Sequence, residues 1–409
     1  RTLADIRKGI QREKTAQVLD IIHTFKHSPY ITPSSFLLTH NHFTSSEVIL
    51  QSHVHLLCID EEVVKFIEFD EVVGSELFNT RKYPILPIAH MENAKRMIHV
   101  TRSDFDRIVD AVETSQREVV WMFHTGRCGS TVCSQIFNAL PDWTVISENE
   151  AHIYTMSHSN YDIQEFCKTV QYEQMVVAWI KMYLRLIPQN NSVFWKANIV
   201  DPHIIPVLQK RFPKHRILFS YRDVLPCGMS YYKAFGGLDG MLFAIYYILN
   251  PWLKHGREDK HSKQIRLCFT NGYNKSQCLQ AMRSVLPNPG VMEWFVLFWA
   301  TTVTMMREYR EKAGVEFKCV KYEDLQSKPR EVITDLFKYL NISSEFVSLA
   351  LQTMETDSQA GLFFDREKRV NFKAWTRTTD SVKKCNAILD MFNLPDFDTE
   401  YIFPSLTLN

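Results

Sequence analysis

Residues 119–137 read VVWMFHTGRCGSTVCSQIF and are the most informative part of the chain. An apolar run is followed by a turn with two glycines, and a helical pattern begins at Ser130. This order predicts a buried strand, a tight loop and a helix. Gly126 and Gly129 allow the backbone to curl, so that successive N–H groups and the positive end of the helix dipole can surround an anion. The stretch therefore predicts a phosphate-binding loop.

The side chains of this loop suit an anion but differ from those of a nucleotide-hydrolysing P-loop. Ser130 and Thr131 supply hydroxyl donors. Arg127 supplies the cation, and Cys128 lies beside it in the turn. The pattern G-x-x-x-x-G-K-[ST] would place a lysine before the hydroxyl residue, whereas Gly129 directly precedes Ser130 here. The positive charge of the predicted phosphate site therefore comes from an arginine.

Strand and helix patterns alternate beyond this loop. The apolar strand candidates are Val119–Phe123, Thr144–Ser147, Val193–Ala197, Arg216–Tyr221 and Phe317–Tyr322. The alternation predicts an α/β fold with a P-loop-type parallel sheet flanked by helices. Ligands bind at the carboxyl ends of the strands in such sheets. The residues that follow each strand are therefore the first candidates for a site.

The N-terminal part of the chain shows a different pattern. It begins with a helical-looking segment and continues with β-type runs, and Val54–Ile59 and Val63–Phe69 flank polar residues as the strands of a hairpin would. We therefore expect an N-terminal α+β appendage over residues 1–117. The domain with the parallel sheet is expected over residues 118–409.

A second strand-to-helix junction occupies residues 216–233, which read RILFSYRDVLPCGMSYYK. Arg222 follows the strand, and Ser230 lies about two turns into the predicted helix. The planar fork of arginine suits a phosphate group, and the Ser230 hydroxyl is placed to join it on the same anion. The alternative is a surface arginine paired with Asp223. The junction predicts a second phosphate site.

Together the two junctions resemble PAPS-dependent sulfotransferases, which use 3′-phosphoadenosine 5′-phosphosulfate (PAPS). Residues 124–131 resemble the 5′-phosphosulfate loop of that family in its Arg-x-Gly-Ser-Thr form. Residues 216–233 are similar to its 3′-phosphate-binding element, with Arg222 and Ser230 at the same separation. The resemblance covers residues 119–395. It implies a sulfotransferase domain with PAPS as co-substrate.

The resemblance also implies which residues bind PAPS. Tyr322 lies in a segment similar to the family's strand ending in Tyr-Glu-Asp-Leu and would contact the adenine, although an aromatic residue at a strand end is also typical of a core. Lys368 and Arg369 resemble the basic loop that closes over the 3′-phosphate, but the family's Arg-Lys-Gly form is not reproduced. The residues implied at the 5′ end are Gly126, Arg127, Cys128, Gly129, Ser130 and Thr131.

The implied reaction is transfer of a sulfuryl group to an acceptor hydroxyl or amine by in-line displacement. Positioning and electrostatic stabilisation carry most of such a reaction. Arg127 is placed to contact the bridging and 5′-phosphate oxygens, and Lys196 matches a family lysine that faces the same region; a solvent-exposed strand end is the alternative for Lys196. Because these cations supply the charge, no metal is expected. Two His-x-His pairs, at residues 40–42 and 53–55, are expected on polar strand faces instead.

The general base must lie beside the acceptor, and residues 147–152, SENEAH, follow the second strand of the predicted sheet. In the tyrosine- and carbohydrate-directed branches of the family a glutamate in this place acts as the base. Glu148 is therefore the first choice. Glu150 and His152 are its competitors, and a helix-cap or surface role is the alternative for all three.

Two other functions are compatible with a phosphate loop. A P-loop kinase or nucleotide hydrolase is opposed by the missing lysine and by the Arg222 and Ser230 element. A non-catalytic nucleotide-binding scaffold is the third possibility. For a sulfotransferase, the expected acceptor is a small molecule, a lipid or a carbohydrate. The sequence does not decide among these acceptors and a tyrosyl peptide. It also leaves the oligomeric state open.

Composition narrows the class of protein further. A formal net charge of +1 provides no strongly basic face, so no nucleic-acid partner is expected. Nine scattered cysteines without C-x-x-C pairs predict a reducing compartment, which favours the cytoplasm. Because the chain begins at Arg1, a removed leader or anchor, and with it the Golgi lumen, stays open. Val291–Met306 contains a glutamate and is shorter than a membrane span, so it predicts a core helix.

Overall fold

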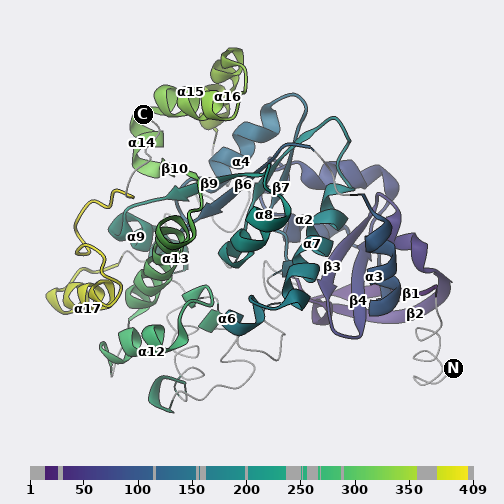
Figure 1. Ribbon diagram of the computed structural model, residues 1–409, viewed down its shortest axis with the longest axis horizontal. Helices are drawn as coiled ribbons and strands as arrows, with labels where there is room; N and C mark the ends of the chain where they lie inside the picture. Colours follow the sequence, from purple (N-terminus) through teal and green to yellow (C-terminus); the bar gives the residue numbers. More distant parts are fainter. Residues whose placement is uncertain are drawn as a thin grey trace. The chain divides into compact units, whose positions relative to one another are not determined.

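The computed structural model describes residues 14–25, 31–113, 117–152, 156, 163–198, 201–235, 250, 252–255, 266–267, 269–286, 290–356 and 375–403 (Figure 1). The chain divides into two compact units. The first comprises Arg1–Val119, Asp142–Asn198 and Pro206–Lys214, and the second comprises Val120–Pro141, Ile199–Ile205 and His215–Asn409.

The first unit contains an antiparallel sheet formed by the N-terminal part of the chain. β3 and β4 pair as an antiparallel hairpin, as their sequence predicts. The side chains of β3 are buried along its whole length. The sheet has the order β2-β1-β5-β4-β3, and its strands are β1 (Thr15–Thr24), β2 (Phe36–Ser45), β3 (Val54–Ile59), β4 (Val63–Glu68) and β5 (Arg96–Thr101).

The second sheet is parallel and confirms the expected α/β fold. All six residues of its central strand are buried, as a strand covered on both faces requires. The strands lie within two residues of the predicted bounds. The sheet has the order β10-β9-β6-β8-β7, and its strands are β6 (Val119–His124), β7 (Trp143–Ser147), β8 (Ser192–Lys196), β9 (Arg216–Tyr221) and β10 (Lys318–Lys321).

Helices follow the parallel strands, because parallel neighbours in a sheet are joined by crossover connections that are usually helical. The helices along residues 86–211 are α2 (Leu86–Asn93), α3 (Arg102–Ala111), α4 (Ser130–Ala139), α6 (Ile163–Phe166), α7 (Val170–Leu184) and α8 (Ile205–Arg211). Those that follow are α9 (Val224–Phe235), α12 (Lys275–Arg283), α13 (Val291–Ala313), α14 (Tyr322–Ser327), α15 (Pro329–Tyr339), α16 (Val347–Met354) and α17 (Thr379–Asp390). Short 3-10 helices are η1 (Pro33–Ser35), η2 (Ser46–Leu50), η3 (Glu71–Phe78), η4 (Asp201–Ile204) and η6 (Ser344–Phe346).

Helix α13 is the long core helix of the second unit. Its side chains from Met292 to Met306 are buried, as the apolar sequence predicts. The indole N–H of Trp299 donates to the carbonyl oxygen of Arg222 at 2.7 Å. Phe295 stacks on Tyr231 of α9, with ring centres 4.9 Å apart. Helix α13 therefore fixes the backbone that follows β9. Within the described ranges, no helix is both long enough and apolar enough to cross a membrane.

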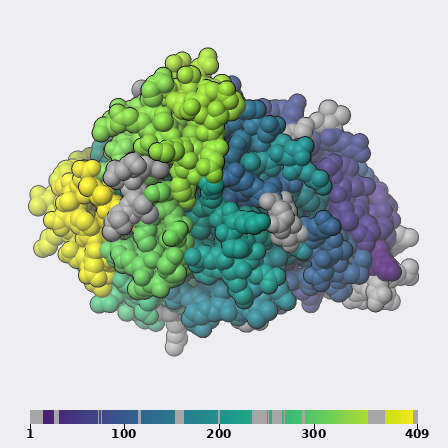
Figure 2. Space-filling view, turned by 45° about the horizontal axis from the view of Figure 1, so that its top comes forward, coloured from purple at the N-terminus to yellow at the C-terminus, as the bar shows by residue number. Residues whose placement is uncertain are grey.

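The C-terminal segment 375–403 packs on this core helix, and Figure 2 shows it in yellow beside the green of α13. Arg307 of α13 donates to the carbonyl oxygens of Phe392, at 2.8 Å, and Asn393, at 3.1 Å. The rings of Trp299 and Tyr401 meet edge to face, 5.3 Å apart. Residue Tyr401 of this segment also reaches the β9–α9 junction, where its amide donates to the Asp223 carboxylate at 2.9 Å.

Candidate active site

The loop between β6 and α4 is tightly curled. Gly126, Arg127 and Gly129 all have left-handed backbone conformations, with φ of 68°, 51° and 80°. Gly129 is the N-cap residue of α4, so the first N–H groups of that helix have no intrahelical partner. A left-handed arginine is uncommon, because only glycine adopts this conformation without steric cost. The loop therefore has the shape that its glycines predict, with backbone strain at Arg127.

Four consecutive carbonyl groups of the loop, those of residues 125–128, accept hydrogen bonds from side chains of the β9–α9 segment. Because C=O and the following N–H point in opposite directions across a trans peptide, the N–H groups of residues 127–129 point away from these side chains. The N–H of Gly126 donates to Nδ1 of His124 at 3.1 Å. Burial raises the pKa of the Cys227 thiol, which keeps it protonated as a donor. The donors are Ser220 on Cys128 (3.0 Å), Arg222 on Arg127 (3.4 Å), Cys227 on Gly126 (3.4 Å) and Tyr231 on Thr125 (3.2 Å).

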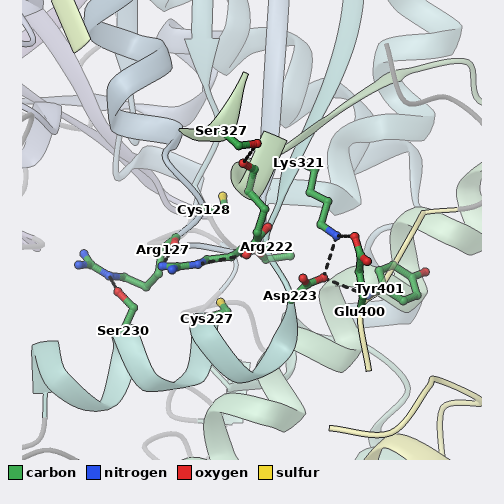
Figure 3. Close-up of polar contacts among 12 residues, drawn as sticks. Arg127, Cys128, Arg222, Asp223, Cys227, Ser230, Lys321, Ser327, Glu400 and Tyr401 are labelled. Atoms are coloured by element: carbon green, nitrogen blue, oxygen red, sulfur yellow. Dashed lines mark hydrogen bonds and ion pairs between the residues drawn. The ribbon is translucent and has the colours of Figure 1, made fainter. Parts of the chain in front are cut away.

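Arg127 links the loop to helix α9. Its Nε donates to Oγ of Ser230 at 3.0 Å, and Figure 3 shows this contact beside Arg222. Arg127, Arg222 and Ser230, which the sequence assigns to two separate phosphate sites, are therefore joined in one hydrogen-bonded cluster. Ser130 and Thr131 begin α4 and are buried.

Arg222 has few partners for its guanidinium group. It lies over the ring of Tyr322, 4.4 Å from the ring centre. Its Nε is 3.5 Å from Oε1 of Glu323, and in the described part of the chain this nitrogen has no hydrogen-bond acceptor. The alternative pairing with Asp223 is not found, because the Asp223 carboxylate lies 3.3 Å from Nζ of Lys321 and accepts from the Tyr401 amide at 2.9 Å (Figure 3). Arg222 therefore retains donors for an anion.

Tyr322 closes one side of the loop. It is the first residue of α14 rather than the last of β10. A Cβ atom added to Gly129 would lie 2.7 Å from Cδ2 of Tyr322. The ring is thus placed between Gly129 and Arg222. This environment accounts for a glycine at residue 129 by close approach as well as by its positive φ.

The packing of Tyr322 gives a stability prediction. Gly129→Ala is expected to lower the free energy of unfolding by about 2–4 kcal/mol, because left-handed alanine is strained and the ring must also move. Gly314→Ala is the matched control, since Gly314 has a similar φ of 66° and nothing within 4 Å of an added Cβ. It is expected to cost only about 1–2 kcal/mol. Equal losses in urea titrations would show that Tyr322 does not pack on Gly129.

Glu148 and Lys196 form a buried pair in the first unit, at the carboxyl ends of β7 and β8. Ser147 and Lys196 are register partners in the sheet. The Glu148 amide donates to the Lys196 carbonyl at 2.9 Å, and the side chains form an ion pair, Oε1 to Nζ, at 2.5 Å. Lys196 is 2% exposed, so the solvent-exposed alternative is not what the structure shows. Glu148 has a φ of 49°, which is strained for a non-glycine residue.

The two competing base candidates have other partners. Glu150 is fully buried, and its Oε1 lies 2.5 Å from Nδ1 of His90. His152 is buried as well; its Nε2 lies 3.0 Å from the Tyr172 hydroxyl and its ring stacks on Trp179. The structure therefore places the three candidates in one short segment but gives each a different environment.

Lys368 and Arg369, the candidates for the loop over the 3′-phosphate, lie outside the described residues.

The histidines of the two His-x-His pairs contact other side chains. His40 Nδ1 contacts Gln17 at 3.2 Å and His55 contacts His90 at 3.0 Å, so these two members of the pairs have non-metal partners. In the ranges that the structure describes, no group of three or more His, Cys, Asp and Glu residues is arranged to hold a metal ion.

Sequence reasoning missed several residues around the loop. Ser220, Cys227 and Tyr231 hold its carbonyl groups, and Glu323 faces Arg222. The residue types carry no distinctive signal, since serine, cysteine and tyrosine are common in strands and helices. For Ser220, Cys227 and Tyr231 the signal is position, because they lie in or after β9, the strand that neighbours β6 in the sheet.

Comparison with known proteins identifies the family. The family model described as the sulfotransferase domain matches residues 117–384. Among solved structures, a sulfotransferase from Mycobacterium avium is similar, with a TM-score of 0.39 and 13% identity over 80% of this chain and 87% of that one. A sulfotransferase from Alicyclobacillus acidocaldarius has a TM-score of 0.32 and 13% identity over 68% of this chain and 97% of that one. No curated protein matches the chain. Because the matched domain spans well over half of its length, the chain belongs to the sulfotransferase family.

Proposed function

We propose that this chain transfers a sulfuryl group from PAPS to an acceptor hydroxyl or amine. One observation carries the proposal: the segment that holds the four loop carbonyls also supplies Arg222 and Ser230. A loop whose amides point away from that segment suits the 5′-phosphosulfate. An arginine with unused donors on the same segment suits the 3′-phosphate. One doubly phosphorylated adenosine would satisfy both.

Donor binding is assigned to the second unit. The loop amides, the start of α4 and the hydroxyl groups of Ser130 and Thr131 would bind the 5′-phosphosulfate. Arg127 would balance the charge that develops on the bridging oxygen during transfer. Arg222 would bind the 3′-phosphate with charge-assisted hydrogen bonds, with Ser230 beside it. Tyr322 is proposed as the adenine contact.

The chemical step is assigned to Glu148 and Lys196. Glu148 would accept the proton of the acceptor hydroxyl while the acceptor oxygen forms a bond to sulfur. The bond from sulfur to the bridging oxygen breaks, and adenosine 3′,5′-bisphosphate leaves with the electron pair. Lys196 would hold Glu148 in place and stabilise negative charge in the transition state. Arg127 and Glu148 both have strained backbone conformations, which are typical of functional residues.

The acceptor and the compartment complete the proposal. We assign the acceptor to small molecules, lipids or carbohydrates. The scattered cysteines support the cytoplasm, with the Golgi lumen as the alternative. Residues 236–249, which follow α9, lie outside the described residues.

The direct test is transfer of ³⁵S from labelled PAPS to an acceptor panel of 4-nitrophenol, an N-acetylglucosamine glycoside, cholesterol and a tyrosyl peptide. We expect transfer to at least one acceptor, with unchanged rate in EDTA, because the cations are protein side chains. Turnover of ATP that disappears in EDTA would instead identify a P-loop kinase or hydrolase. Binding of adenosine 3′,5′-bisphosphate without transfer to any acceptor would favour a non-catalytic scaffold.

The ion pair between Arg222 and Glu323 gives a pH prediction. Burial raises the pKa of the Glu323 carboxyl, the charge of Asp223 adds to the rise, and Arg222 opposes it. A bound 3′-phosphate would repel ionised Glu323 and raise its pKa further, so binding takes up a proton. The affinity for adenosine 3′,5′-bisphosphate should therefore rise as the pH falls through the Glu323 pKa.

Glu323→Gln separates this effect from protonation of the phosphate itself. It is expected to tighten binding of adenosine 3′,5′-bisphosphate by about threefold to tenfold near pH 8 in low salt, with a smaller gain at low pH. Asp324→Asn is the matched control, because it removes a neighbouring charge that forms no ion pair with Arg222. Equal effects of the two substitutions in calorimetric titrations would contradict a local role for Glu323.

A further inference from the structure

We infer that the N-terminal region orders the segment that carries Glu148, with His90 as a positioning residue that holds Glu150. The inference rests on the proposed role of Glu148 as base. The N-terminal region lies before residue 117, where the sulfotransferase domain match begins. It gives a function to a part of the chain that the family match leaves without one.

A buried chain of three ionisable side chains connects the N-terminal sheet to this segment. His90 of α2 contacts Glu150 through Nδ1, at 2.5 Å, and His55 of β3 through Nε2, at 3.0 Å. All three residues are 0% exposed. Contacts of this length between fully buried groups fix the positions of both partners, because water cannot replace them. The Glu150 side chain is thereby tied to two elements of the N-terminal region.

Within the hydrogen-bonded group of His55, His90 and Glu150, His90 is the residue that stabilises the Glu150 carboxyl group. Burial lowers the pKa of His55 well below its ordinary value, and the charge of His90 lowers it further, so His55 stays neutral. In the described part of the chain Oε2 of Glu150 has no hydrogen-bond partner. A buried carboxylate without a partner is strongly unfavourable. Among the described residues, the hydrogen bond with His90 is therefore the one that the Glu150 carboxyl group makes.

The N-terminal region also contacts Ser147, the residue that precedes Glu148. The Ser147 hydroxyl donates to the carbonyl oxygen of Pro84 at 2.7 Å, two residues before α2 begins. Residues 84–90 thus contact both the residue before Glu148 and the residue two positions after it. A glutamate with a φ of 49° persists only where its surroundings enforce that conformation. These two contacts supply the enforcement from the N-terminal side.

Helix α7 anchors the same segment from the sulfotransferase domain. The indole N–H of Trp179 donates to Oδ1 of Asn149 at 2.9 Å, and His152 contacts the Tyr172 hydroxyl at 3.0 Å. These contacts would remain if the contact from His90 to Glu150 were lost. The expected consequence is therefore a local loss of order around Glu148 rather than loss of the fold.

His90→Gln and His90→Asn are a matched pair that tests this inference in the full chain. An asparagine amide reaches the position of Nδ1 and can still donate to Glu150, whereas a glutamine amide reaches the position of Nε2 and meets His55 instead. We expect H90Q to raise hydrogen–deuterium exchange in residues 143–152 by at least about tenfold. It should lower kcat for the best acceptor of the panel by at least about tenfold. H90N should stay within about threefold of wild type in both measurements.

His53→Gln is the control for a general effect on the N-terminal region. His53 lies 3.6 Å from the carboxylate of Glu68, which belongs to the same region. H53Q should leave exchange in residues 143–152 and kcat unchanged. The affinity of H90Q for adenosine 3′,5′-bisphosphate should stay within about twofold of wild type, since a positioning residue for the base changes kcat rather than donor binding. Should H90Q not fold, H90Q/E150L, which leaves no unpaired buried carboxylate, is expected to show the same rise in exchange.

The outcomes separate this inference from the proposed function. If His90 acts through Glu148, adding H90Q to E148Q lowers kcat no further. Folded H90Q with wild-type exchange and wild-type kcat would overturn the inference. A fully active E148Q would overturn Glu148 as the base, while the exchange comparison between H90Q and H90N would still decide whether His90 orders the segment.

Discussion

Replacing Glu148 by glutamine is expected to lower turnover by about 10²–10⁴-fold. Glutamine keeps the shape of the side chain and can still accept from Lys196 through its oxygen. It cannot take up the acceptor proton. The loss should therefore appear in kcat for sulfuryl transfer, while the affinity for adenosine 3′,5′-bisphosphate changes by less than about twofold. Steady-state kinetics with labelled PAPS and calorimetry with the desulfated product measure the two quantities.

Glu165→Gln is the matched control for this substitution. Glu165 also pairs with a lysine, Lys168, at 2.7 Å, but its side chain is 72% exposed. Exposed pairs of this kind contribute little to stability, so this variant should retain wild-type turnover. A fully active E148Q would contradict the assignment and would transfer the role of base to Glu150 or His152.

Replacing Arg222 by alanine is expected to weaken the binding of adenosine 3′,5′-bisphosphate by about 1.5–3 kcal/mol, the worth of a hydrogen bond to a charged group. This corresponds to roughly 10-fold to 150-fold in the dissociation constant. Adenosine 5′-monophosphate lacks the 3′-phosphate, and its affinity should change by less than about threefold. The difference between the two nucleotides isolates the contact with the 3′-phosphate from any general damage to the site.

Arg216→Ala is the control within the same strand. Arg216 begins β9, whereas Arg222 follows its end, and its guanidinium lies over the ring of Tyr339, 5.6 Å from the ring centre. This substitution should leave the affinities for both nucleotides unchanged. If Arg222→Ala weakens the two nucleotides equally, the assignment of a 3′-phosphate site to Arg222 fails.

Much of the fold follows from local sequence. Parallel strands buried on both faces appear as continuous apolar runs, so Val119–Phe123 and Arg216–Tyr221 predict β6 and β9 almost residue for residue. The glycines of the loop predict its left-handed conformations. At Tyr322 the local pattern gives the wrong boundary: the run 317–322 predicts a strand up to this residue, but helix α14 begins there and the Tyr322 ring packs against Gly129.

Only part of the candidate site can be predicted from the sequence. Arg127, Arg222 and Ser230 lie in motifs whose spacing is informative. The residues that donate to the loop carbonyls cannot be predicted in this way, since only the pairing of β6 with β9 brings Ser220 beside Cys128. His90 gives no signal at all, because a histidine in a short helix acquires its role through a tertiary contact 60 residues away.

A crystal structure with adenosine 3′,5′-bisphosphate tests the central claim most directly. We predict one nucleotide whose 5′-phosphate contacts the amides of residues 127–131 and whose 3′-phosphate contacts Arg222 and Ser230. A nucleotide bound elsewhere, or one whose two phosphates reach only one of these junctions, would contradict the account.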